Sequence, residues 1–292
     1  MSLGAGPSDL GLLPGGSSGG PVRTRRRRRV SWRAATVAAV STFVFFGVLA
    51  AVVTGAPGWK EVQASFLNPT YFWGSLPDVV RHFSVNVQLF LIAEVLILVF
   101  GLLLAVLRSL PGPAFFPVRL LATIYVDLFR AVPGILVIYM LGFGMPALGV
   151  AGIPVDRFFW AVVALTLLYS AYVSEVYRAG IESIHPSQEA AARSLGLSRT
   201  QALRYVVLPQ AVRRVIPPLL NDFIGLQKDT VLVSFLGVVE LFRTAAIKQA
   251  ATFNFTPFLA VALVFVVVTI PLARIVDWLI ARDRAKAAAG AR

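Results

Sequence analysis

The chain contains no cysteine among its 292 residues, which excludes disulfide bonds and thiolate metal sites. Only two histidines occur, His82 and His185, and they do not form the H-E-x-x-H pattern of a helical zinc site. None of the four lysines follows a glycine, so the chain has no G-x-x-x-x-G-K-[ST] loop for ATP phosphates. We therefore expect a non-enzymatic protein without a metal site or a cofactor of its own.

Charged residues are also scarce. They make up 14% of the chain, whereas hydrophobic residues make up 57%, and the mean hydropathy is +0.77. A soluble domain is far less apolar than this. Segments long enough to cross a bilayer as helices occur at 34–53, 83–107, 119–144, 158–177, 212–240 and 256–280. The sequence therefore predicts an all-α, polytopic membrane protein with six transmembrane helices.

The first apolar segment follows a run of arginines. Residues 1–30 include a Gly/Ser-rich stretch and then Arg23 and Arg25 to Arg29, so we expect a disordered basic tail. Arginine runs also bind nucleic acids, but one that directly precedes 34–53 favours the positively charged cytoplasmic anchor of a membrane helix. We therefore expect no nucleic-acid partner. A cleaved signal peptide is the alternative, although its apolar region is usually shorter.

Lysines and arginines are distributed unevenly between the two sides of this predicted bundle. Nineteen fall in segments on the side of the arginine tail, and five fall on the other side: Lys60, Arg81, Arg157, Arg243 and Lys248. This asymmetry predicts that both termini and the polar segment after the fourth span are cytoplasmic. Residues 54–82 carry proline and aromatic residues and are predicted to lie at the outer interface without spanning.

A polar stretch at 187–209 separates the fourth and fifth spans. Ser187 is predicted to cap a first short helix, and Gly196 to end it in the left-handed conformation. Ser198 and Gln201 fit a capping box for a second helix, which Pro209 should limit. The stretch is therefore predicted to form a compact hairpin of two helices.

This hairpin has two apolar surfaces with different predicted roles. Leu203, Val206 and Val207 share one helical face and should dock on the bundle. Leu195 and Leu197 flank the turn and should be exposed, as a knob that enters a groove of a soluble partner would be. An ordinary amphipathic loop that packs only on its own bundle remains the alternative.

Ionisable residues inside the apolar segments are costly and therefore mark functional or packing sites. Two pairs have i, i+3 spacing, Asp127 with Arg130 and Glu175 with Arg178, and structural ion pairs are the alternative reading of both. Glu94 stands alone and needs a cation, a proton or a water-filled cavity. The candidate substrate pathway comprises Glu94, Asp127, Arg130, Glu175, Asn221, Lys228, Asp229 and Thr230.

Two proline motifs are predicted to interrupt the spans. Pro133-Gly134 should kink the third span, and Pro217-Pro218 should break the approach to the fifth. Freed carbonyl groups at the kink would line a cavity or ease helix packing.

The hairpin resembles the signature loop of the membrane-spanning subunits of ATP-binding-cassette (ABC) importers, which reads E-A-A, then glycine, then I-x-L-P. Gly196 and Val206 to Pro209 fit this pattern, whereas the glutamate, Glu189, lies one position early. In that family the glutamate braces the loop. The resemblance implies an ATPase-coupling loop made by Gln188, Glu189, Ala190, Ala191, Leu195, Gly196, Leu197, Leu208 and Pro209.

Three further stretches extend the likeness over residues 83–280. Asp127 to Pro133 resembles E-x-F-R-G-T-P, Ala171 to Ile181 resembles A-Y-x-x-E-x-x-R-x-x-I, and 208–230 contains L-P-Q-A, P-P-L, N-x-F-I and K-D-T. Together they are similar to the importer branch for polar amino acids: glutamate, glutamine, histidine and arginine. This branch implies a five-helix type I core, to which 34–53 adds one helix.

The resemblance also implies a domain organisation and a mechanism. We expect an extra helix and outer segment over 31–80, a transmembrane domain over 81–281 with its hairpin at 182–210, and a cytoplasmic tail over 282–292. The chain would import polar amino acids through the cytoplasmic membrane by alternating access. Its expected partners are a separate ATPase subunit that binds ATP-Mg, an extracytoplasmic amino-acid-binding protein, a second permease subunit and membrane lipid. Alternatives are an importer branch for peptides, metals or other small solutes, a channel, and a membrane enzyme, whose metal or nucleophile constellation is missing.

Overall fold

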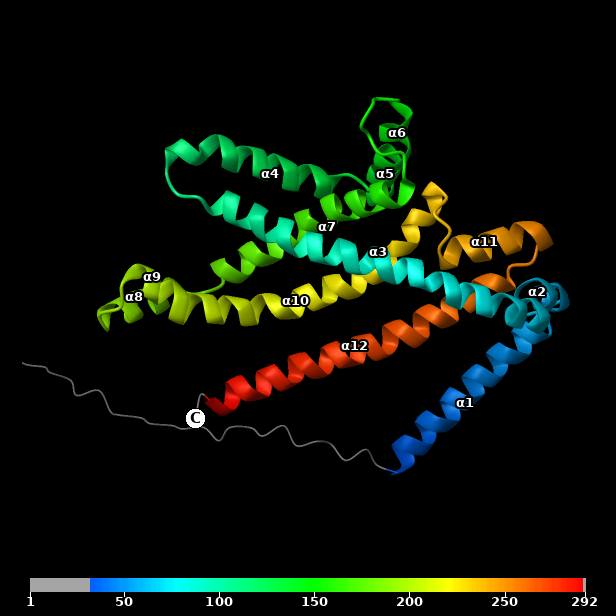
Figure 1. The fold of residues 1–292 in the computed structure, drawn as a ribbon. Coiled ribbons are helices and arrows are strands. Elements are labelled where there is room, and N and C mark those ends of the chain that lie inside the picture. The colour runs from blue at the N-terminus through cyan, green and yellow to red at the C-terminus, as the bar shows by residue number, and fades with distance from the viewer. Residues whose placement is uncertain (1–31, 291–292) are drawn as a thin grey trace, which may run out of the picture. The chain divides into compact units, whose positions relative to one another are not determined.

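A computed structural model describes residues 32–290, and the predicted basic tail lies outside this range. The described residues form helices and loops without a β-strand (Figure 1). They divide into two compact units, one ending at Trp59 and the other beginning at Lys60. The all-α prediction is therefore confirmed for the described part of the chain.

The first unit contains one long helix, α1 (Trp32–Thr54), which matches the span predicted at 34–53. Every residue of α1 is exposed within the structure, including large side chains such as Phe43 and Phe45. A helix that is apolar on every face requires lipid or protein around it.

The second unit carries the remaining helices. In chain order they are α2 (Trp59–Phe66), α3 (Pro69–Ser109), η1 (Pro113–Phe115), α4 (Phe116–Ala131), α5 (Gly134–Tyr139), η2 (Met140–Gly144), α6 (Met145–Ala147), α7 (Arg157–Glu182), α8 (Pro186–Ser194), α9 (Arg199–Ala202), η3 (Leu203–Val207), α10 (Leu208–Asp229), η4 (Thr230–Leu236), α11 (Leu241–Thr252) and α12 (Thr256–Gly290). Including α1, the described residues provide four helices that are long and apolar enough to span a membrane, or up to six if each of two bent pairs is one span.

The core of this unit lies where α3, α7 and α10 meet. Leu89, Ile97, Leu165 and Leu226 are fully or almost fully buried there. Gly101 brings α3 close to α7, because a Cβ at this position would lie 2.6 Å from Val173 Cγ1. Small residues commonly allow such close approach between membrane helices. A second cluster joins α3 to α11 and α12.

The span predicted at 119–144 consists of two parts that meet at a large angle. α4 ends at Ala131, the chain is extended at Val132, and the helices that start at Gly134 diverge by 105°. A residue before proline avoids helical geometry, which explains the break before Pro133. The predicted kink at Pro133-Gly134 is confirmed, and the bend is large enough to divide the predicted segment into two separate helical directions.

Neither predicted break in the fifth span occurs. Helical structure continues from α9 through η3 and α10, across Pro209, Pro217 and Pro218. η3 is a π-helical turn just before Pro209. A wider turn relieves the clash between a proline ring and the preceding carbonyl groups. Pro217 and Pro218 are half-buried, and packing by neighbouring helices makes prolines tolerable in membrane helices.

The predicted interfacial segment at 54–82 is also not separate from the second span. α3 has 41 residues and runs from Pro69 to Ser109 without interruption. Its length, roughly 60 Å, exceeds a hydrocarbon core of about 30 Å. Its first turns therefore extend the spanning helix beyond the membrane core.

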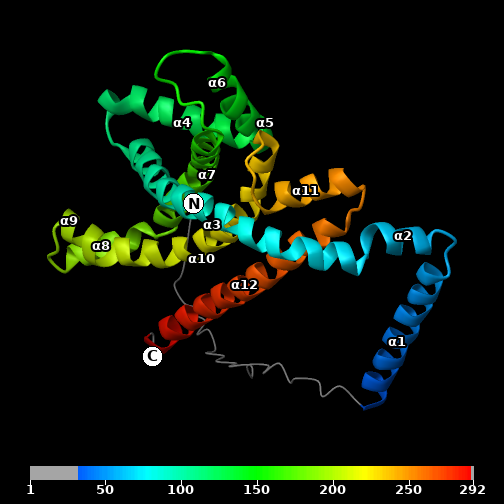
Figure 2. The ribbon, with the colours of Figure 1, turned by 45° about the vertical axis from the view of Figure 1, so that its right-hand side comes forward.

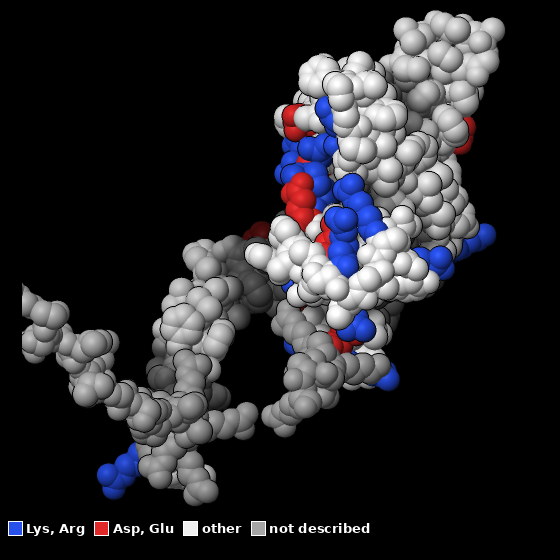
Figure 3. All heavy atoms as spheres, turned by 90° about the vertical axis from the view of Figure 1, so that its left-hand side faces the viewer, with Lys and Arg blue, Asp and Glu red and all other residues white. Residues whose placement is uncertain are grey.

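Several basic segments of the second unit lie at one end. The loop from α3 to α4, the α8–α9 turn and the C-terminal end of α12 are grouped there in both ribbon views (Figures 1 and 2). Figure 3 looks onto this end and shows lysine and arginine side chains gathered on it, with acidic side chains between them. We call it the basic end below.

Candidate functional site

The α8–α9 hairpin projects from the basic end, and its first helix begins two residues earlier than the sequence predicts. α8 starts at Pro186, and its N-cap is His185, whose Nδ1 accepts a hydrogen bond from the Ser187 amide at 3.2 Å. Ser187 is therefore not the cap. Proline favours the first helical position because its φ is preset and its missing N–H has no partner to lose there.

The turn of the hairpin has the predicted geometry. Gly196 has φ +89°, the left-handed conformation that favours glycine. The Leu197 amide donates to the Ala192 carbonyl at 3.3 Å, and the Gly196 amide donates to the Arg193 carbonyl at 3.0 Å. These two bonds form a Schellman motif. The prediction that Gly196 ends the first helix is confirmed.

Side-chain contacts fix the second arm of the hairpin. Ser198 and Gln201 form the predicted capping box, with bonds of 3.3 Å and 2.9 Å. Glu189 Oε1 lies 3.6 Å from Arg199 Nε in the other arm, so Glu189 reaches across the loop from its shifted position. Gln210 donates to Gln188 at 3.4 Å and joins the arms a second time.

The apolar surfaces of the hairpin differ in part from the prediction. Val207 is buried with Ile184 and Ala211, which docks the hairpin on its own bundle. Leu203 is half exposed, so it docks on the bundle less completely than the sequence predicts. Leu195 is 85% exposed at the tip, whereas Leu197 is only partly exposed.

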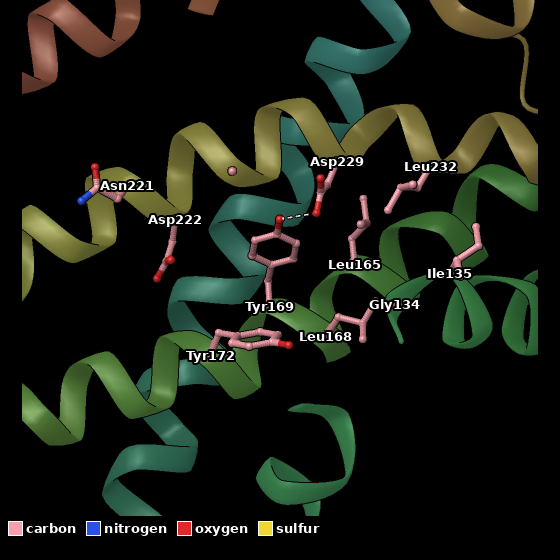
Figure 4. A pocket seen from close by; sticks show the side chains of 11 residues that line it. Gly134, Ile135, Leu165, Leu168, Tyr169, Tyr172, Asn221, Asp222, Asp229 and Leu232 are labelled. Carbon is pink, nitrogen blue, oxygen red and sulfur yellow. Dashed lines mark hydrogen bonds between the residues drawn. The ribbon is translucent and has the colours of Figure 1, made fainter. Parts of the chain in front are cut away.

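A second feature is a pocket between α5, α7, α10 and η4, with a volume of about 350 Å³ (Figure 4). Asp222 and Asp229 enter it from α10, and Tyr169 and Tyr172 face them from α7. Tyr169 donates its hydroxyl hydrogen to Asp229 Oδ2 at 2.7 Å. Asp222 Oδ2 is buried and accepts no hydrogen bond from the described residues. No lysine or arginine is among the residues that line the pocket.

The pocket includes only part of the predicted substrate pathway. Asn221 and Asp229 line it, although the Asn221 side chain points away from the tyrosines in Figure 4. Lys228 is exposed and does not line it. Thr230 is buried and donates to the Gln227 carbonyl at 2.8 Å, so its contacts are structural.

Sequence reasoning missed Asp222, Tyr169 and Tyr172. The spacing of Asp222 and Asp229 was the available signal, because residues seven positions apart lie on one side of a helix. Glu94 of α3 lies near Asp222, is half-buried and forms no ion pair with the described residues. Acidic side chains therefore outnumber basic side chains around the pocket.

Glu175 forms a charged cluster between the pocket and the basic end. It accepts hydrogen bonds from Arg108 of α3 and from Arg178 of its own helix, the latter at 2.6 Å. Arg130 of α4 lies 3.8 Å from the same carboxylate. The predicted Glu175–Arg178 pair is confirmed. The alternative reading of Asp127 with Arg130 as an ion pair is wrong, because Arg130 turns toward Glu175 and Asp127 is exposed.

Arg130 also connects this cluster to the pocket. Its guanidinium carbon lies 6.0 Å from the centre of the Tyr172 ring, within the range of a cation–π contact. A cation is therefore present at the edge of a pocket whose lining contains two acidic side chains and no basic one. The described residues contain no group of three or more His, Cys, Asp or Glu side chains placed to hold a metal ion.

Comparison with known proteins identifies the family. The family described as "Binding-protein-dependent transport system inner membrane component" matches residues 97–284, more than half of the chain. The chain belongs to this family. The matched range includes the hairpin, the Glu175 cluster and the pocket, and leaves α1 outside. The permease is thus a multi-pass membrane subunit of a transporter.

Named relatives of the permease are similar over most of their own length. The probable amino-acid ABC transporter permease protein PatM of Vibrio harveyi is 34% identical over 71% of this chain and 92% of its own. The probable glutamine ABC transporter permease protein GlnM of Bacillus subtilis is 37% identical over 62% and 82%. These similarities confirm the predicted likeness to amino-acid ABC permeases.

Solved structures agree with the fold of the permease. A crystal structure of an amino acid ABC transporter with histidines has 31% identity and a TM-score of 0.65, and the match covers 70% of this chain and 94% of that one. An inward-facing methionine ABC transporter, MetNI, has a TM-score of 0.57 at 18% identity and supports the fold alone.

Proposed function

We propose that the permease imports polar amino acids across the cytoplasmic membrane by alternating access, driven by a separate ATPase subunit that binds ATP-Mg. One observation carries this proposal: the hairpin and the pocket share one continuous helical rod. The rod runs from Arg199 to Asp229 and holds both pocket carboxylates, Asp222 and Asp229. Movement of the hairpin would therefore shift one wall of the pocket.

The hairpin has the properties of a coupling element. Its turn and its caps are fixed by hydrogen bonds, and Leu195 stands exposed at its tip. An exposed leucine on a rigid projection suits insertion into a groove of a soluble protein. Closure of two ATPase subunits would push on this tip, and the rod, roughly 45 Å long, would transmit the push to the pocket.

The pocket has the charge pattern that a zwitterion needs. Asp222 and Asp229 would accept hydrogen bonds from an α-ammonium group, and Arg130 at the edge would bind the α-carboxylate. Tyr169 and Tyr172 would provide aromatic surface for the rest of the ligand. The names of relatives, which include glutamine, glutamate/aspartate and arginine permeases, support an amino acid as cargo.

The distribution of charge supports the proposed topology. We infer that the basic end is cytoplasmic, since positively charged loops remain on that side. Both termini, with the tails at 1–30 and 282–292, would then be cytoplasmic. The transport domain would extend over 81–281, and the segment at 31–80 would add one helix. An amino-acid-binding protein would deliver the cargo outside, and a second permease subunit would complete the membrane part.

Uptake by reconstituted complexes tests this function. Proteoliposomes would contain the permease with its ATPase and binding protein, and labelled amino acids would be screened with and without ATP. We expect uptake of at least one polar amino acid, only with ATP. Asp222→Asn should raise the half-saturating concentration about tenfold, the equivalent of one weakened charge-assisted hydrogen bond.

Asp277→Asn provides the matched control, because Asp277 is exposed on α12 and lies outside the pocket. It should leave the half-saturating concentration unchanged. Uptake without the ATPase would contradict the proposed coupling, and an unchanged Asp222→Asn variant would exclude the pocket as the binding site.

A further inference from the structure

A separate groove lies between α10 and α12 at the basic end. It has a volume of about 580 Å³, and its walls include Arg213, Ile216 and Leu220 of α10 and Leu279 and Asp283 of α12. Its residues lie on a different side of α10 from Asp222 and Asp229, since successive residues turn by roughly 100°. The groove is therefore not part of the amino-acid pocket.

Polar and apolar residues are ordered along this groove. On α10, Arg213 lies nearest the basic end, and Leu220 lies about 10 Å farther along the helix. α12 runs in the opposite direction (Figures 1 and 2), so Asp283 lies nearest the basic end and Leu279 lies farther in. The two helices thus agree: the groove has a charged mouth and an apolar interior.

The charges at the mouth do not neutralise each other. Arg213 is exposed and forms no hydrogen bond or ion pair with the described residues, and Asp283 likewise has no ion-pair partner there. The two groups share the groove but lie farther apart than an ion pair. Arg214 donates one hydrogen bond to the Ser183 carbonyl at 2.6 Å and also faces the groove. The mouth therefore offers separated positive and negative groups.

Neighbouring side chains place this mouth at the depth of lipid head groups. Trp278 of α12 is 57% exposed, and the Arg282 guanidinium carbon lies 5.2 Å from its ring centre. Exposed tryptophan with arginine is typical of the membrane–water interface. An apolar channel that opens at this level faces acyl chains on its inner side and head groups at its mouth.

We propose that the groove binds a phospholipid with a phosphoethanolamine head group. The phosphate would lie on Arg213 and Arg214, the ammonium group on Asp283, and one acyl chain along Ile216, Leu220 and Leu279. Basic pockets between membrane helices on the cytoplasmic side bind phosphate head groups. The carboxylate of Asp283 selects among phosphate head groups. It attracts a head group with an ammonium group and repels one that carries a further negative charge. α10 also carries Asp222 and Asp229 of the amino-acid pocket. The lipid would therefore stabilise the packing of this helical rod on α12.

Lipid retention by the full-length permease in its complex tests this proposal. Nanodiscs of phosphatidylethanolamine, phosphatidylglycerol or phosphatidylcholine would be compared by native mass spectrometry after detergent extraction. The wild type should retain phosphatidylethanolamine preferentially. Arg213→Gln should reduce retention of every phospholipid about fivefold, as expected for loss of one ionic contact near a membrane surface. Asp283→Asn should abolish the preference for phosphatidylethanolamine over phosphatidylglycerol.

Two further variants guard against misfolding and nonspecific effects. Leu220→Trp should displace the lipid by filling the apolar part of the groove, without changing a charge. Arg193→Gln, on the exposed hairpin and outside the groove, should leave lipid retention unchanged. Equal retention of all three lipids by the wild type, or a preference for phosphatidylglycerol, would overturn the proposal.

A second copy of the chain is the competing occupant. Leu279→Cys tests it cleanly because the protein has no other cysteine. Disulfide cross-linking between two Leu279→Cys copies in membranes would show that a subunit covers the groove and would overturn the lipid assignment. Absence of this cross-link, together with retained phosphatidylethanolamine, supports the lipid.

Discussion

The Glu175 cluster gives a sharp prediction for stability. This carboxylate binds Arg108 and Arg178 directly and lies near Arg130, and its side chain is only 19% exposed. Glu175→Gln keeps the shape of the side chain but leaves three guanidinium groups without their shared counter-charge. Removing one partner of a buried ion pair costs about 3 to 5 kcal/mol. Because the cluster is partly exposed, we expect a loss of about 2 to 3 kcal/mol.

The matched control is Glu182→Gln. Among the described residues Glu182 pairs only with Arg178, and it is 60% exposed, so its loss should cost under about 1 kcal/mol. For a protein of this size, one kcal/mol corresponds to a shift of about 2 to 4 °C in Tm. Thermal unfolding of purified protein in detergent should therefore show a fall of about 4 to 12 °C for Glu175→Gln. Raising the salt concentration should not remove the difference, because partly buried pairs are weakly screened. Equal Tm values for the two variants would refute the reasoning.

Two other predictions concern single positions, Asn86 and Gly196. Asn86 donates to Glu240, which is fully buried, at 2.9 Å and to Thr230 at 3.1 Å, so Asn86→Leu should destabilise the protein by about 2 to 4 kcal/mol. Gln88→Leu should have little effect in the same unfolding assay, because Gln88 is exposed; equal losses would contradict a role of the buried network. Gly196→Ala should cost about 1 kcal/mol and weaken co-purification of the ATPase, because alanine does not favour φ +89°. If the Gly196→Ala variant co-purified as much ATPase as the wild type, the turn at Gly196 would not be required for ATPase binding.

The sequence predicted best those features that depend on a few neighbouring residues. The turn at Gly196, the Ser198 capping box and the Glu175–Arg178 pair each arise from spacings of five residues or fewer. Such contacts form within one or two helical turns and need no knowledge of the rest of the fold. The apolar segments were likewise predicted as helices, because the length and composition of a segment are enough to indicate a membrane-spanning helix.

Features that depend on packing between helices could not be predicted from neighbouring residues in the sequence. Arg130 has Asp127 three residues away, yet it turns to Glu175 on another helix. Pro209 predicted the end of a helix, but a π turn accommodates it. Asp222 carried no local signal apart from its distance to Asp229, and its role emerges only when α7 lies opposite α10. In each of these cases, contacts between helices determine the local structure or the role of the side chain.

The central claim is that the hairpin tip contacts the ATPase, and site-specific cross-linking tests it most directly. The protein has no cysteine, so Leu195→Cys provides a single labelling site at the exposed tip, and Leu203→Cys provides one on the flank of the same hairpin. Both would carry a short photoactivatable cross-linker in the assembled complex. The account predicts strong cross-linking to the ATPase from position 195 and much less from position 203. Cross-linking from position 203 alone, or from neither position in an actively transporting complex, would contradict it.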